Sequence, residues 1–219
     1  MGFLRRLFGP SQDEVWRQFS DQIGAEFFKG SFFKGVSKVQ ATIEKAEVTL
    51  DTFVVSTGKS SVTYTRIRAV FLNKAGFRFT IYRKGLFSGL GKLLGMQDIE
   101  VGGPKFERLE PLFGTPGYLD EQIIESGSPE FDRDFIIKAN DESKARSIFK
   151  QLKIRELIDS QPSIFLQLRE TDKRTRERLG SATDELYFQE VGVIKDPSRL
   201  GSLFELYREI LKTLRNTGS

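Results

Sequence analysis

The stretch VTYTRIRAVFLNKAGFRFTIYR, residues 62–83, decides the fold, because its side chains follow the two-residue period of β-strands. In its second half Phe77, Phe79 and Ile81 share one face, and polar or amphipathic side chains share the other. The connection NKAG at 73–76 is too short for anything but antiparallel neighbours. Two consecutive antiparallel strands are therefore expected here.

More strands precede this stretch. Val39, Ala41 and Ile43 alternate with polar neighbours, and residues 48–57 are rich in β-forming side chains. The sequence GKSS at 58–61 is typical of a turn and leads directly into the next strand. Short connections between consecutive strands predict an antiparallel meander.

Helix signals lie on both sides of these strands. A capping box at 11–14 begins a first helix, whose apolar residues recur four apart as far as Phe27. A middle helix follows a cap at 140–141, and a C-terminal helix follows the N-cap Asp196. The C-terminal helix has the clearest apolar stripe of the chain, at 200–214.

Alternation returns at 164–168 and 186–188, which predicts a second hairpin with a charged tip. Strands grouped together, rather than alternating with helices, favour an α+β fold over a doubly wound parallel sheet. We expect an antiparallel sheet, a meander plus the second hairpin, with the N-terminal, middle and long C-terminal helices packed on it. Residues 1–10 form an amphipathic tail, and 11–219 form one domain with an irregular excursion at about 85–130.

Composition narrows the chemistry. The 219 residues include neither Cys nor His, which removes thiol nucleophiles, Ser-His-Asp triads and the usual zinc ligands. An enzyme would have to use Asp, Glu, Lys, Tyr or Ser, so the sequence leans away from catalysis and predicts no cofactor. Glu130, Asp132 and Asp134 would share a face if extended, but Arg133 lies among them, and no metal site is expected.

The most pointed segment is RKGLFSGLGKLLGM, residues 83–96. It is not a phosphate-binding loop, because the glycine spacing is one residue too long and Leu93 stands where Ser or Thr must hold magnesium. As a helix it is amphipathic and basic, as interfacial membrane helices and partner-binding helices are. The candidate binding residues are Arg83, Lys84, Leu86, Phe87, Leu90, Lys92, Leu93 and Leu94. The alternative is a short helix packed on its own domain.

The N-terminal tail repeats this chemistry in residues 3–8, FLRRLF, so the two segments could together contact an anionic surface. The tail is too short for a secretory signal, and no stretch approaches 18 apolar residues. The expected location is the cytoplasm, with peripheral contact to a membrane through the two segments. The expected partner is an anionic membrane surface or a protein, and the sequence leaves the oligomeric state open.

Two other functions compete with this one. A sheet covered by a long helix could enclose a cavity for an enzyme or a small-ligand carrier. Five basic residues at 169–178 could grip phosphates, but interleaved carboxylates and the lack of an aromatic side chain argue against nucleic acid.

Four stretches carry a resemblance to known sequences: YTRIR at 64–68, GFRF at 76–79, GMQDI at 95–99 and FDRDF at 131–135. Through them the chain resembles an uncharacterised bacterial family of small proteins, over about half of its length. It implies a bacterial cytoplasmic origin, and no activity or site residue comes with it. The leading hypothesis is therefore a non-enzymatic binding module that uses residues 83–96.

Liposome co-sedimentation tests this hypothesis. The protein should pellet with vesicles that contain anionic lipid, and Leu90→Asp or Leu93→Asp should abolish the binding, because a carboxylate on the apolar face opposes insertion and is repelled by anionic headgroups. Unchanged binding by these variants, shown to be folded by circular dichroism, would exclude the segment.

Overall fold

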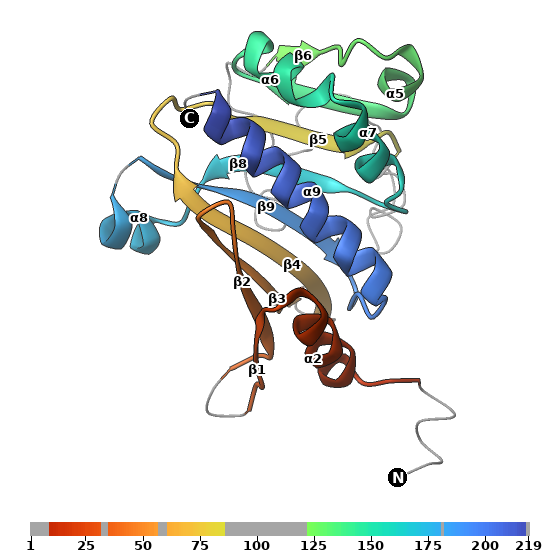
Figure 1. Cartoon of the computed structure of the whole chain (residues 1–219), viewed down its shortest axis with the longest axis vertical. Helices are drawn as coiled ribbons and strands as arrows, with labels where there is room; N and C mark the ends of the chain where they lie inside the picture. The colour runs from red at the N-terminus through yellow and green to blue at the C-terminus, as the bar shows by residue number, and fades with distance from the viewer. Residues whose placement is uncertain (1–8, 32–34, 57–60, 86–121, 181, 218–219) are drawn as a thin grey trace.

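The computed structural model describes residues 9–31, 35–56, 61–85, 122–180 and 182–217 (Figure 1). It contains a nine-stranded sheet in the order β1-β2-β3-β4-β9-β8-β5-β7-β6, and every pair of neighbouring strands is antiparallel. The strands are β1 (Glu26–Phe28), β2 (Lys38–Ile43), β3 (Ala46–Ser56), β4 (Ser61–Leu72), β5 (Phe79–Arg83), β6 (Gln122–Ile124), β7 (Phe135–Ala139), β8 (Phe165–Glu170) and β9 (Thr183–Val191). The expected α+β class is confirmed.

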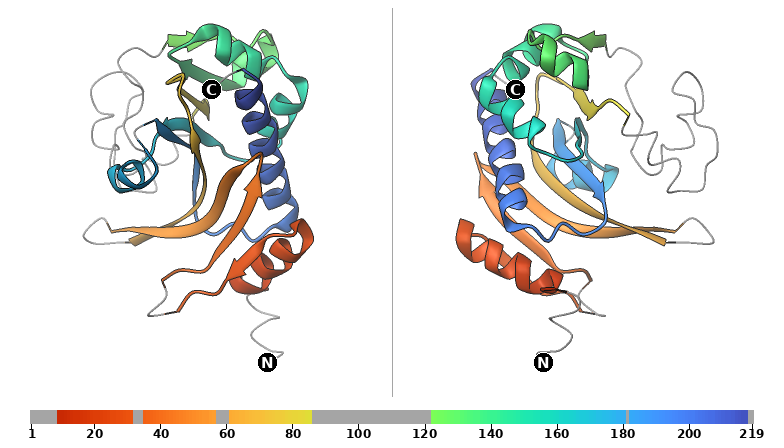
Figure 2. Two further views of the ribbon diagram at one scale, coloured as in Figure 1. Left: turned by 60° about the vertical axis from the view of Figure 1, so that its left-hand side comes forward. Right: turned by 90° about the vertical axis from the view of Figure 1, so that its right-hand side faces the viewer.

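The described helices are α2 (Gln12–Ile23), α5 (Pro129–Asp134), α6 (Glu142–Phe149), α7 (Leu152–Asp159), α8 (Lys173–Leu179) and α9 (Pro197–Asn216). Helices α2, α6, α7 and α9 lie on one face of the sheet (Figures 1 and 2), and α9 lies over β4 and β9. None of the described helices is long and apolar enough to cross a membrane.

The strand order differs from a simple meander at one place. Strands β1 to β4 pair in sequence, but β5 does not pair with β4 and instead lies between β8 and β7. Asn73 helps to turn the chain away, because its side-chain amide donates to the carbonyl oxygen of Phe77 and to Asp184, both at 2.7 Å. The edge of β4 is taken by β9, which begins beside Leu72.

One apolar core lies between the sheet and the helices. The stripe of α9 is buried as expected and packs on the inward-facing residues of the central strands, including Ile67 and Leu186. The hydroxyl of Tyr207 donates to the carbonyl oxygen of Ile67 on β4 at 2.7 Å and to that of Leu186 on β9 at 3.3 Å. Helix α9 therefore fastens both strands of the central pair.

The structure differs from the sequence analysis at two further places. The first helix ends at Ile23, because Gly24 takes a left-handed conformation with φ 67°, and Phe27 belongs to strand β1. The acidic stretch around Asp132 is the short helix α5 rather than an extended segment, because Pro129 occupies the first turn and the backbone amide of Asp132 bonds to Ser128. The alignment on one face that an extended chain would give these three carboxylates therefore does not form.

Candidate functional site

The basic residues that open the 83–96 segment are held by the domain itself. The Arg83 guanidinium donates to the carbonyl oxygens of Asp159 and Gln161, at 3.0 and 3.3 Å, and lies 4.5 Å from the centre of the Phe135 ring. The ammonium of Lys84 donates to the carbonyl oxygen of Asp132 at 2.9 Å. Both side chains thus hold the end of β5, and the charge of Arg83 is also paired with Asp159 at 3.2 Å.

The other candidate residues of that segment lie outside the described residues: Leu86, Phe87, Leu90, Lys92, Leu93 and Leu94. Their role in binding stays a prediction from the sequence.

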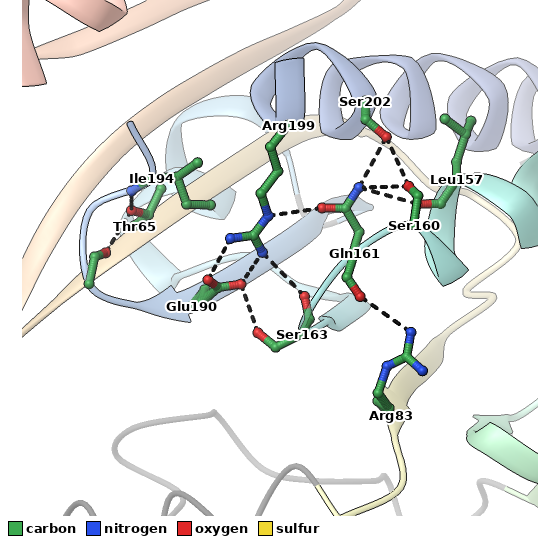
Figure 3. A network of polar contacts seen from close by, with 11 residues as sticks. Thr65, Arg83, Leu157, Ser160, Gln161, Ser163, Glu190, Ile194, Arg199 and Ser202 are labelled. Atoms are coloured by element: carbon green, nitrogen blue, oxygen red, sulfur yellow. Dashed lines mark hydrogen bonds and ion pairs between the residues drawn. The ribbon is translucent and has the colours of Figure 1, made fainter. Parts of the chain in front are cut away.

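Arg83 belongs to a larger polar network at the start of α9 (Figure 3). Arg199 on α9 forms a bidentate ion pair with Glu190 on β9, and its Nε donates to Gln161 at 3.2 Å. Gln161 in turn donates to Ser202 at 3.0 Å, and Ser163 donates to Glu190 at 2.7 Å. Apart from Nε of Arg83, which is buried without an acceptor among the described residues, these groups are paired in charge and hydrogen bonding, so we assign the network a structural role.

A groove of about 410 Å³ lies at the other end of α9, between that helix and the sheet. Its walls come from the β2–β3 turn and β3 (Glu44, Lys45, Ala46), β4 (Val70, Phe71, Leu72), α8 and β9 (Leu179, Thr183) and α9 (Leu211, Leu214, Arg215). Ala46, Leu211 and Leu214 are buried, whereas Leu72 and Leu179 are 55% and 49% exposed. The groove thus has an apolar floor and an apolar, solvent-facing rim.

The turn at the mouth of this groove is strained. Ile43 pairs with Ala46, so Glu44 and Lys45 form a two-residue hairpin turn, with φ values of 49° and 67°. Such turns favour Asn-Gly, because a β-carbon in the left-handed region costs about 1–2 kcal/mol per residue. Strain that persists in a fold is a reason to look for a function at that place.

The strained turn positions charge beside the apolar floor. Glu44 forms an ion pair with Arg215 on α9, with a nitrogen–oxygen distance of 2.9 Å. Lys45 is exposed and has no carboxylate within ion-pair distance among the described residues. One end of the groove therefore carries two cations against one carboxylate.

Sequence reasoning missed this turn, because neither Gly nor Asn marks it. A signal was nevertheless present in the phase of the apolar alternation. Val39, Ala41 and Ile43 occupy odd positions, whereas Val48 and Leu50 occupy even ones, and such a shift indicates a break between two strands.

A second polar region covers the centre of the sheet on the side away from α9, and we call it the polar face. It consists of Asp51, Arg66, Arg68, Gln167, Arg169, Glu185, Tyr187 and Gln189. These residues alternate along their strands with core residues such as Leu186 and Phe188, which places them on the opposite face. The strand register sets Arg68 opposite Tyr187, and Tyr187 opposite Gln167.

Two of the three arginines on the polar face are fully engaged. Arg66 forms a bidentate ion pair with Asp51 at 2.8 and 2.7 Å and lies over the Phe53 ring. Arg169 pairs with Glu185 at 3.0 Å and stacks on Tyr187, 3.4 Å from the ring centre. Arg68 has no such carboxylate partner among the described residues, and its Nε is buried without an acceptor.

Burial dominates the electrostatics here. Desolvation raises the pKa of Glu185 above its usual value, although Arg169 and Arg68 pull it down. Desolvation also raises the pKa of Tyr187. The neutral forms of both groups are thus favoured more than in water.

The basic stretch expected at 169–178 is largely neutralised within the fold. Arg169 pairs with Glu185, Arg176 with Glu170 at 2.6 Å, and Lys173 with Glu177 at 3.8 Å. Most of the tip is the short helix α8. Because these arginine and lysine side chains are paired within the fold, the structure does not favour phosphate binding by residues 169–178, and most of the tip is helical rather than an open loop.

Within the described part of the chain, no group of three or more acidic residues could hold a metal ion. Comparison with protein-family models, with curated proteins and with solved structures finds no match to this chain. The resemblance to an uncharacterised bacterial family therefore stays a prediction.

The raised pKa of Glu185 has a measurable effect on stability. The folded protein holds a proton on this carboxyl more tightly than the unfolded chain does, so Glu185 lowers the free energy of unfolding as the pH rises from the ordinary carboxyl pKa through the raised one. The Glu185→Gln variant has no carboxyl at this position, so its free energy of unfolding does not fall for this reason as the pH rises. Its free energy of unfolding, minus that of the parent, should therefore increase over that pH range in urea denaturation.

The exposed Glu177 provides the control, because Glu177→Gln removes the same charge at the surface of α8. A difference for Glu185→Gln that shrinks as the pH rises would contradict the assignment of a desolvated carboxyl.

Proposed function

We propose that this protein is a binding protein for a small amphiphile, with the apolar chain in the groove beside α9 and an anionic headgroup at Lys45. The observation that carries the proposal is the strained Glu44–Lys45 turn at the mouth of an apolar groove. A hairpin under selection for stability alone would place Asn-Gly there.

The size of the groove supports a small ligand. Its volume of about 410 Å³ lies within the range of about 300–1,000 Å³ of small-molecule sites, which are mostly apolar with a few placed polar groups. The buried floor residues Leu211 and Leu214 belong to α9, a 20-residue helix, so the floor is rigid before a ligand arrives. A preformed site loses little conformational entropy on binding.

The charges at the mouth favour an anionic headgroup. Arg215 is already paired with Glu44, and this ion pair holds the turn against the end of α9. Lys45 is the cation left with capacity for a ligand, and it is exposed beside the apolar rim. A carboxylate or phosphate at the end of an apolar chain matches this arrangement.

The proposal develops the expectation of a cavity between the sheet and the C-terminal helix. Most of that interface is solid core, because Leu200, Leu203, Phe204 and Tyr207 are buried on the sheet. Among the described residues, the groove opens at the end of this interface, beside the last pair of β4 and β9 residues, Leu72 and Thr183. Binding through residues 83–96 stays a separate proposal, which rests on the sequence.

Titration calorimetry with dodecanoate below its micelle concentration tests the proposed function. The parent protein should bind it saturably, with weaker binding of the cationic dodecyltrimethylammonium. Leu72→Asp should abolish dodecanoate binding, because it places a carboxylate on the apolar rim. Leu152→Asp is the matched control, since Leu152 is 62% exposed on α7 and does not line the groove.

Lys45→Gly separates stability from binding. It relieves a left-handed lysine and should raise the free energy of unfolding by about 1 kcal/mol. It should also weaken dodecanoate binding about tenfold, because the charged donor is lost. Lys74→Gly removes an exposed lysine from another turn and should leave binding unchanged. Equal binding by Lys45→Gly and Lys74→Gly, or equal affinity for the anionic and cationic probes, would refute the proposed headgroup site.

A further inference from the structure

Within the part of the chain that the structure describes, two buried polar atoms on the polar face have no hydrogen-bond partner: Nε of Arg68 and Oε2 of Glu185. Arg68 lies opposite Tyr187 in the β4–β9 register, and Glu185 is two residues away on the same face of β9. Such diagonal neighbours have Cα atoms about 7–8 Å apart, within reach of one small group placed between their side chains. A donor without an acceptor thus lies beside an acceptor without a donor.

Two carboxylates interact electrostatically with Arg68, those of Asp172 and Glu185, and both already accept hydrogen bonds from other groups. The positive charge of Arg68 acts on the Asp172 carboxylate. The two oxygens of that carboxylate accept from the backbone amide and the hydroxyl of Thr175, at 3.0 and 2.7 Å, and so cap α8. The other oxygen of Glu185 accepts from Arg169 at 3.1 Å. Among the described residues neither carboxylate forms an ion pair with Arg68, and the buried Nε of Arg68 has no acceptor.

The surroundings hold both side chains in place. Arg169 is fixed by its ion pair with Glu185 and by stacking on Tyr187. The Tyr187 hydroxyl donates to Gln189 at 2.8 Å. The free oxygen of Glu185 therefore keeps its position, and a ligand would meet a preorganised acceptor.

The ion pairs described on the polar face leave Arg68 without a carboxylate of its own. Of the three guanidinium groups on this face, Arg66 pairs with Asp51 and Arg169 with Glu185. Asp172 acts on the charge of Arg68 from the start of α8 but forms no ion pair with it among the described residues. A planar guanidinium binds carboxylates well, because its fork of donors matches their two oxygens.

We infer that the polar face binds a small carboxylate that carries a hydrogen-bond donor next to its carboxyl group, as hydroxy acids and amino acids do. The ligand carboxylate accepts from Arg68, and the adjacent hydroxyl or ammonium donates to Oε2 of Glu185. This site uses different residues from the groove beside α9, so the two proposals are independent.

Three probes of similar size test the inference by NMR titration of the backbone amides: L-lactate, L-alanine and acetate. Lactate or alanine should bind saturably and shift the amides of β4 and β9 around Arg68 and Tyr187, and acetate should bind more weakly because it has no donor for Glu185. Comparison of lactate with alanine distinguishes a hydroxyl from an ammonium.

Arg68→Gln should weaken the binding of the better probe by about tenfold or more, the usual effect of losing a charged hydrogen bond. Arg68→Lys keeps the charge without the fork and should fall between the parent and Arg68→Gln. The matched control is Arg174→Gln, because Arg174 is exposed on α8 and its loss should leave binding unchanged.

The inference fails if none of the probes gives a saturable shift with the folded parent protein, which would mean that water alone bridges the two atoms. Equal affinity of Arg68→Gln and Arg174→Gln would also overturn it, as would acetate binding as tightly as lactate and alanine.

Discussion

The pairing of β4 with β9 is the interaction on which the rest of the structure depends. In the described sheet it is the one strand pair that joins β1–β4 to β5–β9. Eight residue pairs, from Thr65 opposite Glu190 to Leu72 opposite Thr183, fix its register. Helix α9 crosses this junction, and the Tyr207 hydroxyl bonds to the backbone of both strands. The two halves of the sheet thereby share one core.

Both proposed sites follow from that junction. The polar face exists because the register places Arg68 beside Tyr187, which alternation along either strand alone would not do. The groove begins where the pairing ends, at Leu72 and Thr183, and α9 continues past that point to supply its floor. A slip of one residue between β4 and β9 would turn every side chain of the slipped strand to the other face and destroy both sites.

The local elements were readable from the sequence, because their signals lie within a few residues. The capping box at Ser11 and the apolar stripe of α9 are such signals, and both are confirmed. The partners of β5 were not readable, because they are set by a competition between strands far apart in the chain, and β9 takes the edge of β4. The Glu44–Lys45 turn was hidden by its lack of the usual turn residues.

The candidate sites were less predictable than the fold. The residues around Arg68 come from strands separated by more than a hundred positions, and the sequence carries no local motif that links them. The cavity beside the C-terminal helix was expected as an architecture, but its residues depend on where two strands stop pairing. The neutralisation of the basic stretch 169–178 was predictable only in part, because some of the carboxylates that pair with it, such as Glu185, lie on a neighbouring strand.

Amide hydrogen exchange in increasing urea tests the central claim most directly. If the β4–β9 junction under α9 unites the sheet, the most protected amides of β3 and those of β8 should open in one shared transition, and Tyr207→Phe should lower the free energy of opening of both sets equally. The account is contradicted if the two sets open in separate transitions, or if Tyr207→Phe destabilises one half of the sheet and leaves the other unchanged.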